Sequence, residues 1–440
     1  MIVTVNRKSD VVAALMFLDA AGVDYVWIHG YERELESDVD LAVSKAAYVK
    51  LSSVLRDFCE RFQFRIVQVL RHEFTGYYFV LAKTENAACR YLVLDFCTDY
   101  MRDGRTLIRS EEFIKGRMLR GEFYIPNPAV EGEYLFLKRT LKGAWLSHHR
   151  EAFQQKLLAS EKELSSRITR HIGVKRSAEF MTCVHENDLA TLNKSVQRFR
   201  KAILGRSLVF SSGDVFVSGM KELIRLMKRV RRPTGLFLAM MGPDGSGKST
   251  VAAQTALILA PAFRKIELMH WRPGFLPEFS GANAANGVTN PHKFEERGRL
   301  LSTLKFFYYL LDFVLGYCFK IVPLRIKSTL VFFDRYYYDF LVDQKRYRMN
   351  VPRWIVKACA GIVARPDAVF FLHAKPEVIL ERKREMSREE LTRQNDEIEK
   401  MAPLLKGNFH SIDANKTIDE IVMALVHASF DIMASKSTVA

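Results

Sequence analysis

A glycine-rich stretch that begins at residue 242 carries the clearest chemistry in this 440-residue sequence. It has the spacing GxxxxGKS and lies between an unbroken apolar run, GLFLAMM, and a helical pattern, TVAAQTALIL. Such a loop folds around an anion with its N–H groups pointing inward, while the lysine faces the β- and γ-phosphates and the serine hydroxyl binds Mg²⁺. We therefore predict an ATP or GTP site, with ATP and Mg²⁺ as cofactors, and not merely a structural glycine turn. Its residues are Gly242, Asp244, Gly245, Ser246, Gly247, Lys248, Ser249 and Thr250.

Further polar groups follow other apolar runs in this part of the chain. The run IELMH is followed by Arg272, and the run TLVFF by Asp334, Arg335 and Tyr336. In open α/β sheets ligands bind at the carboxyl ends of the strands, so these side chains are expected near the phosphates. A helix that starts at Pro376 then leads into a basic run. Its arginines are either a mobile cationic lid or a solvated helix with i, i+4 ion pairs; the candidates are Arg382, Arg384 and Arg388.

With these motifs, most of residues 236–440 resembles the thymidylate kinase family of P-loop kinases. The match rests on GPDGSGKST, WRPG, FFDRYYYD, PDAVFFLHAKPEVILERK and SIDANKTIDEI. The resemblance implies that Asp334 assists the metal or the acceptor phosphate, and that Arg272 and Arg335 grip that phosphate. Asp244 would bind a sugar hydroxyl, and Tyr336 would lie at the acceptor site. Gly245 stands where some members keep an arginine, so transition-state charge would be met from the lid.

The sequence departs from the family where the acceptor would bind. Pro273 directly follows Arg272, where the family has an acidic residue, and the insert FLPEFSGANAANGVTNPHKFEERGR is unlike the family's nucleotide-binding stretch. The acceptor therefore stays open between thymidylate and another small metabolite that bears a phosphate or a hydroxyl.

The first third of the chain has acids of its own. In HGYERELESDVDLAV, Asp38 and Asp40 alternate along a predicted strand, so both carboxylates share one face and could hold a divalent cation. Asp95 ends the run RYLVLDF and could be a third acid on a neighbouring strand. About residues 10–130 resemble the polymerase-β type of nucleotidyltransferase, which implies two-metal nucleotidyl transfer. Tyr31 replaces the family's triphosphate-binding serine, so both a catalytic domain and an inactive one are open.

Three parts follow from these patterns. We predict a nucleotidyltransferase-like α+β domain at 1–130, a basic helical lobe and linker at 131–235, and a thymidylate-kinase-like α/β domain with a parallel sheet flanked by helices at 236–440. Residues 131–235 hold 21 Lys and Arg against 10 Asp and Glu, a net charge of +11 out of +16. Lys138, Arg139 and Lys142 could face a nucleotide, although a solvated basic face is the favoured interpretation.

Composition limits the classes of protein that remain. Six scattered cysteines without a CxxC pair favour a reducing, cytoplasmic location. The most apolar window, LLSTLKFFYYLLDFVLGYCFKIV, is interrupted by Lys305, Asp312 and Lys320, which favours a buried helix over a transmembrane segment. The basic middle lacks the aromatic interleaving of a single-strand groove, which argues against nucleic acid as a partner.

Two functional hypotheses follow. The first is an ATP-dependent kinase for a small-molecule acceptor, fused to a nucleotidyltransferase-like domain. The second is an ATP-binding regulatory or nucleic-acid-associated protein with a degenerate amino-terminal domain. The sequence does not determine the oligomeric state.

Overall fold

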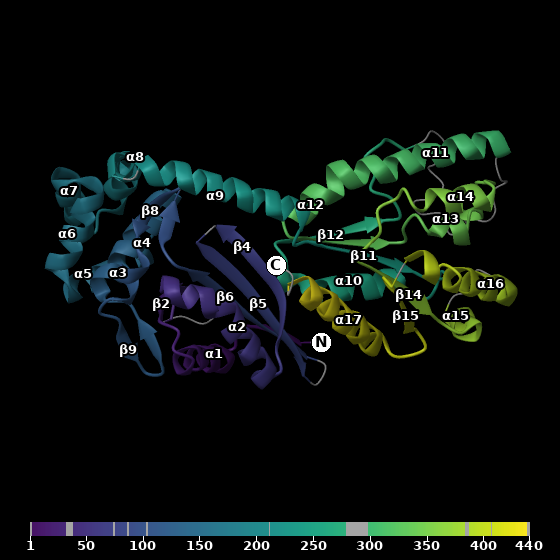
Figure 1. Ribbon diagram of the computed structural model, residues 1–440, viewed down its shortest axis with the longest axis horizontal. Coiled ribbons are helices and arrows are strands. Elements are labelled where there is room, and N and C mark those ends of the chain that lie inside the picture. Colours follow the sequence, from purple (N-terminus) through teal and green to yellow (C-terminus); the bar gives the residue numbers. More distant parts are fainter. Residues whose placement is uncertain are drawn as a thin grey trace. The chain divides into compact units, whose positions relative to one another are not determined.

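The computed structural model describes residues 2–31, 38–73, 75–85, 88–102, 104–210, 212–278, 298–382, 387–405 and 407–437. The chain divides into two compact units (Figure 1). The C-terminal unit consists of Arg229–Ala440 with the short pieces Met1–Val3 and Thr84–Cys89. The N-terminal unit consists of Thr4–Lys83 and Arg90–Lys228.

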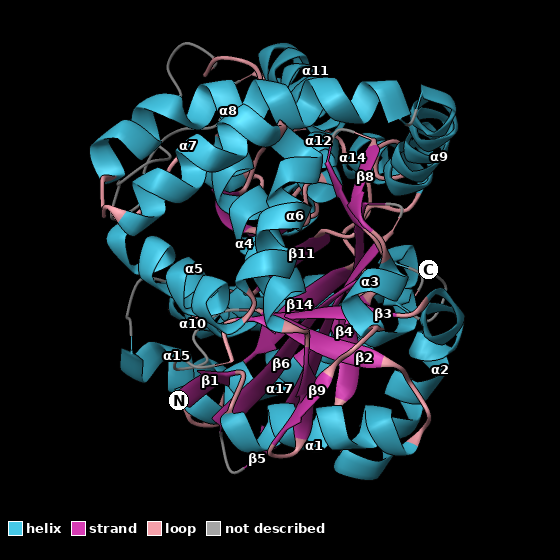
Figure 2. Ribbon diagram, turned by 90° about the vertical axis from the view of Figure 1, so that its left-hand side faces the viewer, coloured by secondary structure: helices cyan, strands magenta, loops and turns pink. Residues whose placement is uncertain are grey.

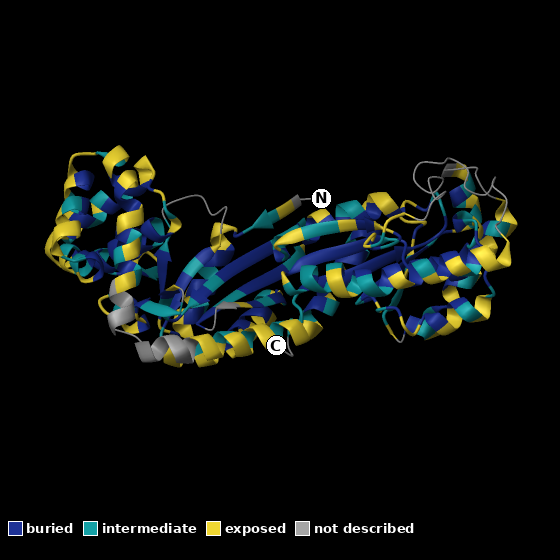
Figure 3. Ribbon diagram, turned by 90° about the horizontal axis from the view of Figure 1, so that it is seen from above, coloured by how far each residue is buried: buried dark blue, intermediate teal, exposed yellow. Residues whose placement is uncertain are grey.

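Five strands form the centre of the C-terminal unit, in the order β12-β13-β11-β14-β15, and all their pairings are parallel. Every residue of β11 is buried, as an unbroken apolar run requires in a central parallel strand (Figure 3). The predicted parallel sheet is confirmed. Its strands are β11 (Leu236–Met241), β12 (Lys265–His270), β13 (Thr329–Asp334), β14 (Ala368–His373) and β15 (Phe409–Asp413).

Helices cover both faces of this sheet, with α11 and α12 on one side and α10 and α17 on the other (Figure 1). Phe237 and Phe333 pack with Phe306 and Phe313 of α11 in one buried cluster. The helices of this unit are α10 (Lys248–Leu259), α11 (Arg299–Gly316), α12 (Val322–Ile326), α13 (Asp339–Val342), α14 (Arg353–Cys359), α15 (Pro376–Arg382), α16 (Arg388–Glu399) and α17 (Ile418–Ser437). The 3-10 turns are Ala260–Ala262, Lys345–Tyr347 and Ala402–Leu405, and a π-helical turn spans Tyr317–Ile321.

Helix α11 is buried on one side only, which corrects the expectation of a buried helix. Phe306 and Phe313 are fully buried, whereas Leu304 and Leu311 are 58% and 49% exposed. Among the residues that the structure describes, Arg299–Ile326 is the one helix long and apolar enough to cross a membrane by length and composition, and 33% of its apolar window is buried. Core helices of other proteins meet the same criterion, so the finding identifies no membrane span.

The N-terminal unit combines a mixed six-stranded sheet, ordered β2-β3-β6-β5-β4 with β1 beside β6, and a set of helices. The strand predicted around Asp38 and Asp40 is found and begins directly after Asp38, and β4 pairs antiparallel with β5. The strands are β1 (Ile2–Val5), β2 (Tyr25–His29), β3 (Val39–Val43), β4 (Arg65–Glu73), β5 (Gly76–Glu85), β6 (Ala88–Cys97), β7 (Tyr100–Arg102), β8 (Arg105–Ile108), β9 (Met118–Arg120) and β10 (Phe123–Ile125). The helices that accompany this sheet are α1 (Lys8–Ala20), α2 (Lys45–Phe62) and α3 (Ser110–Ile114).

The region predicted to be helical, from 131 onward, is confirmed as helical (Figure 2). Its apolar residues form one core around Trp145, Phe153 and Phe180. The chain's division into three domains remains a prediction. The helices here are α4 (Pro128–Lys142), α5 (Ser147–Ala159), α6 (Glu161–Ile172), α7 (Val174–His185), α8 (Leu189–Phe210) and α9 (Ser212–Arg231).

A buried carboxylate ties α6 to α4. The Glu133 side chain is fully buried and accepts hydrogen bonds from Arg167 Nη1 at 2.8 Å, Arg170 Nη2 at 2.7 Å and His171 Nε2 at 2.6 Å. Burial alone would raise the pKa of this carboxyl, but the hydrogen bond and charge of His171 and the charge of Arg170 hold the pKa below its usual value. The ionised carboxylate therefore stabilises the helical core.

Glu133→Gln is expected to lower the free energy of unfolding by about 3 kcal/mol, because it removes the charge of a fully buried carboxylate that Arg167, Arg170 and His171 contact. Because the folded-state pKa is lowered, this contribution is present above the unfolded pKa of about 4.3 and is lost as the pH falls through the folded value. Urea denaturation from neutral to acidic pH measures both effects. Glu163→Gln is the matched control, since Glu163 is 47% exposed and its pair with Arg167 contributes less than about 1 kcal/mol. Equal losses in the two variants would contradict the prediction.

Candidate active site

The glycine-rich loop joins the carboxyl end of β11 to the start of α10. Gly242, Gly245 and Gly247 have φ of 150°, 84° and 88°, in the region that side chains disfavour. A Cβ on Gly242 would lie 3.0 Å from the carbonyl oxygen of Leu372 and from Ser246 Oγ. The glycines are therefore needed for the loop to turn tightly and to pass close to β14.

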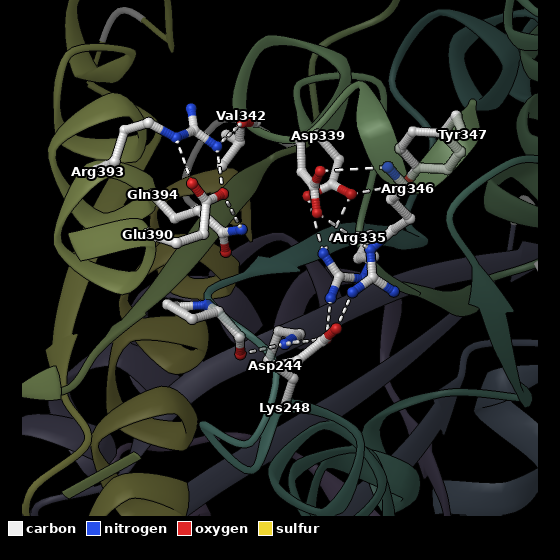
Figure 4. Close-up of polar contacts among 12 residues, drawn as sticks. Asp244, Lys248, Arg335, Asp339, Val342, Arg346, Tyr347, Glu390, Arg393 and Gln394 are labelled. Atoms are coloured by element: carbon white, nitrogen blue, oxygen red, sulfur yellow. Dashed lines mark hydrogen bonds and ion pairs between the residues drawn. The ribbon is translucent and has the colours of Figure 1, made fainter. Parts of the chain in front are cut away.

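The side chain of Lys248, the first residue of α10, bends back over this loop. Its Nζ donates to the carbonyl oxygen of Pro243 at 2.6 Å and lies 3.6 Å from Asp244 Oδ1 (Figure 4). The N-terminal N–H groups of α10 lie in the same place, where a helix favours negative charge. Loop, lysine and helix end are thus arranged as a phosphate-binding cradle.

Ser249 and Asp334 are suited to hold Mg²⁺. Ser249 Oγ donates to Asp334 Oδ2, while Asp334 Oδ1 is buried and has no hydrogen-bond partner among the residues that the structure describes. A buried carboxylate oxygen without a partner is costly, and a hard divalent cation satisfies it with the oxygen ligands it prefers. The two residues therefore fit the predicted metal.

Arg335 connects the end of β13 to the loop. Its side chain is 6% exposed, donates to both carboxylate oxygens of Asp339 at 3.0 and 3.1 Å, and donates through Nη2 to Asp244 Oδ1 (Figure 4). Burial works against the charged form, but the charge of Asp339 and the neighbouring acids raise the pKa of Arg335 above its usual value. The guanidinium is held as a fixed cation next to the phosphate cradle.

Backbone strain marks the same edge of the sheet. Trp271 and Arg335 directly follow β12 and β13 and have φ of 43° and 72°, which are unfavourable for large side chains. Each makes a backbone hydrogen bond of 2.9 Å, from Trp271 N to Asp334 O and from Arg335 N to Met240 O. Strain of about 1–3 kcal/mol per residue persists where the surroundings fix a functional geometry.

Three residues of this network were not predicted from the sequence. Arg346 Nη2 forms an ion pair with the second oxygen of Asp244, and Tyr347 donates to Asp339 Oδ2 at 2.6 Å. Arg346 and Tyr347 lie in the 3-10 turn Lys345–Tyr347, within the unremarkable run DQKRYRMN. For Asp339 a signal was present, because its i, i+4 spacing from Arg335 indicates a pair on one helical turn.

Arg272, predicted to grip the acceptor phosphate, makes protein contacts at the end of β12. Its side chain is 9% exposed, and Nη1 donates to Asp312 Oδ2 at 3.1 Å and to the carbonyl oxygen of Leu276 at 3.0 Å. Asp312 also accepts from the backbone N–H of Gly274 and Leu276. The structure thus uses Arg272 to pin the following turn onto α11, and its role toward an acceptor remains a prediction.

The remaining predicted residues are spread more widely. Tyr336 is 1% exposed, and its hydroxyl donates to the carbonyl oxygen of Ala364, so the ring packs in the core. Arg388 lies at the start of α16, where its guanidinium pairs with Glu377. Arg384 and the side chain of Arg382 lie outside the described residues, as does most of the insert after Pro277.

A cleft of about 440 Å³ opens beside this network, between the segment after α13 and helix α16. Its lining includes Asp343, whose carboxylate lies 3.6 Å from Arg346 Nε, and Arg393, which donates to Glu390 and to the carbonyl oxygen of Val342 (Figure 4). The glycine-rich loop does not line it, so we assign the phosphate chemistry to the loop and not to the cleft.

In the N-terminal unit, the predicted acids lie on neighbouring strands. Strands β3 and β6 are parallel, with Asp40 opposite Asp95. Asp38 Oδ1 accepts from the Tyr78 hydroxyl at 3.1 Å; loss of hydration and the nearby charge of Asp40 raise the pKa of the Asp38 carboxyl. Asp40 Oδ2 pairs with Lys138 Nζ at 2.9 Å, so this lysine of the basic face contacts an acid instead of solvent.

Among the described residues, these acids do not form part of a preformed metal-binding group of side chains. Within the described ranges, the structure has no group of three or more His, Cys, Asp or Glu side chains that could hold a metal ion. Burial raises the pKa of the Asp38 carboxyl, and the charge of Asp40 adds to this shift. Metal binding by Asp38, Asp40 and Asp95 therefore remains a prediction.

The parallel sheet, the glycine-rich loop with Lys248 and Ser249, and Asp334 at the end of the adjacent strand define a P-loop kinase domain. Residues 241–425 match the family model described as "Thymidylate kinase", less than half of the 440-residue chain. No curated protein matches the chain. The chain thus contains a thymidylate kinase-like domain, which confirms that part of the resemblance.

Proposed function

We propose that the C-terminal unit transfers the γ-phosphoryl group of ATP to a small acceptor, either a nucleoside monophosphate or another sugar or phosphate metabolite. The observation that carries this proposal is the convergence of Lys248, Arg335 and Arg346 on the carboxylate of Asp244. Three cations aimed at one anionic group beside a phosphate cradle form a site for a more highly charged anion. Arg335 and Arg346 each contact one oxygen of the Asp244 carboxylate, and an acceptor phosphate would be bound by the same two guanidinium groups.

Each residue then has a distinct task in the transfer. The acceptor oxygen bonds to the γ-phosphorus as the bond from that phosphorus to the β–γ bridging oxygen breaks and ADP leaves. Phosphoryl transfer needs alignment and cations near the equatorial oxygens more than covalent chemistry. Lys248 contacts the β- and γ-phosphates, while Arg335 orients the acceptor and Arg346 supplies positive charge. Mg²⁺, when held by Ser249 and Asp334, neutralises phosphate charge.

Arg346 can also supply the positive charge that the loop lacks because residue 245 is a glycine. Gly245 stands where some thymidylate kinases have a cationic side chain, and the sequence pointed to the lid for a replacement. Arg335 and Arg346 both contact the loop through Asp244, whereas Arg388 pairs with Glu377. Arg335 already has the task of orienting the acceptor, which leaves Arg346. We therefore assign the compensating charge to Arg346.

We propose a second activity, metal-dependent nucleotidyl transfer, for the N-terminal unit. The observation that favours it is the side-by-side placement of Asp40 and Asp95 on parallel strands, with the pKa of Asp38 raised next to them. Lys138 and Lys142 lie near Asp40, and the charge of Lys138 contributes to the lowered pKa of Lys142, after loss of hydration. Such lysines would contact the phosphates of a nucleotide.

One experiment tests both activities. Purified protein and Mg²⁺ are incubated with a panel of nucleoside monophosphates, sugars and sugar phosphates, using ATP labelled at either the α or the γ phosphate. We expect γ-label to reach an acceptor with the intact chain and not with Lys248→Ala. We expect α-label transfer to be lost in Asp38→Ala/Asp40→Ala but kept in Lys248→Ala. Absence of γ-label transfer to every acceptor would count against the kinase, and absence of α-label transfer against the second activity.

A further inference from the structure

Helix α9 has an apolar side and a basic side. Over Gly219–Arg232, the six apolar residues fall within about half of the helix circumference at 100° per residue. They are Met220, Leu223, Ile224, Leu226, Met227 and Val230. The opposite side carries most of the six Lys and Arg of this stretch, against the single acid Glu222. A helix of a globular protein with this pattern normally turns its apolar side toward the core.

Helix α9 instead turns its polar side toward the protein. Arg225 is 9% exposed, pairs with Glu222, and donates to the carbonyl oxygen of Arg71 at 2.6 Å within the N-terminal unit. Within the C-terminal unit, Arg229 donates to the carbonyl oxygen of Ile326 at 2.7 Å and to Ser328 Oγ at 3.0 Å. The polar side of α9 is therefore the side with protein contacts.

The apolar side faces solvent. The six apolar residues are 45–54% exposed, and the end of α9 is coloured largely as exposed (Figure 3). Half-exposed leucine, isoleucine and methionine side chains in one continuous strip on a helix mark an interaction surface.

Charge decides what covers this strip. Lys228 and Arg231 are exposed and lie at its edge, next to Ile224, in a chain whose net charge is +16. A second copy of the same helix would bring an identical positive edge against them. Anionic lipid headgroups match the charge, while the acyl region of a bilayer accepts the apolar residues.

We propose that α9 binds the surface of an anionic lipid bilayer, lying in the interface plane with its apolar strip inserted and its basic edge at the headgroups. The helix does not span the bilayer, because its charged side stays in water. The protein would thereby bring its catalytic units to a membrane surface, independently of the acceptor that they use.

The test uses the full-length protein and co-sedimentation with vesicles. Binding is expected to vesicles of phosphatidylcholine with phosphatidylglycerol, to weaken as salt is raised, and to be much weaker to phosphatidylcholine alone. Leu223→Gln/Met227→Gln removes apolar contacts and is expected to weaken binding about tenfold. Lys228→Ala removes one charge and is expected to weaken it about fivefold.

Leu158→Gln provides the matched control, because Leu158 is a 78% exposed leucine on α5, and it is expected to bind like the unmodified protein. The substituted α9 residues are already half-exposed, so thermal unfolding is expected to be unchanged in all variants. Failure of the unmodified protein to bind anionic vesicles overturns the proposal, as does undiminished binding by Leu223→Gln/Met227→Gln. Conversion of a dimer to a monomer by that double variant, without vesicle binding by the parent, would instead assign the strip to a second copy.

Discussion

Replacing Lys248 with methionine is expected to lower the rate of γ-phosphoryl transfer by about 10³-fold. Lys248 supplies the charge that faces the β- and γ-phosphates, and methionine keeps the length of the side chain without that charge. In the structure its Nζ already lies at the loop, bonded to the carbonyl oxygen of Pro243. The measurement is transfer of γ-label to the acceptor found in the panel.

The same substitution is expected to leave the fold largely intact. Asp244 keeps its contacts with Arg335 and Arg346, so no buried acid is left without a cation. The lost hydrogen bond to Pro243 costs about 1 kcal/mol. Lys265→Met is the matched control, since Lys265 is 62% exposed at the amino end of β12, the end of the strand away from the site. A Lys248→Met protein that is folded and as active as the Lys265→Met protein would rule out the proposed phosphate site.

The sequence predicted the C-terminal sheet well because its strands are buried on both faces. Runs such as GLFLAMM and TLVFF contain no charged residue and, apart from Thr329, no polar side chain, so a strand was the natural interpretation and its carboxyl end could be placed within one residue. The polar groups that follow each run were correctly located at one edge of the sheet. The residue at which a buried strand ends can thus be predicted from the residue types in that stretch of the sequence.

Side-chain partners were harder to predict, since they depend on segments far apart in the chain. Arg272 was expected to be available for a phosphate, yet Asp312, 40 residues later on α11, holds it together with the turn that follows it. Lys138 was predicted to lie on a solvated basic face, but its Nζ lies 2.9 Å from Asp40 Oδ2. Periodicity indicates which side of a helix is polar and does not say what that side meets.

Helix α9 shows the same limit in another form. The sequence predicted a basic helical region and linker up to residue 235, and α9 is a basic helix in this region. The usual rule would have placed the apolar side against the protein, whereas Arg225 and Arg229 make the protein contacts. Only the three-dimensional contacts distinguish a core-facing helix from one with its apolar side exposed.

The second large effect is expected for Arg346→Met, which should lower kcat for γ-phosphoryl transfer by about 10³-fold with a much smaller change in KM for ATP. An arginine that neutralises charge on the transferring phosphoryl group acts mainly in the transition state. Arg346 is placed for this role by its ion pair with Asp244 of the loop and by Asp343, whose Oδ1 accepts from the Arg346 backbone N–H at 3.2 Å.

Two companion variants separate catalysis by Arg346 from mere support of the turn that carries it. Lys345→Met changes an exposed cation in the same turn and is expected to retain full activity. Arg346→Lys keeps the positive charge without the bidentate geometry, so it should recover part of kcat, which a purely structural defect would not predict.

The variant Arg388→Met tests whether the catalytic positive charge comes from the lid or from the turn that carries Arg346. If Arg346 supplies the charge, Arg388→Met should lower kcat less than about tenfold, because its guanidinium makes a surface pair with Glu377. A larger loss with Arg388→Met than with Arg346→Met would return the catalytic charge to the lid, where the resemblance to thymidylate kinases had placed it. The order of the two losses therefore decides how this chain compensates for the glycine at position 245, since either arginine must reach the same phosphoryl oxygens above Lys248.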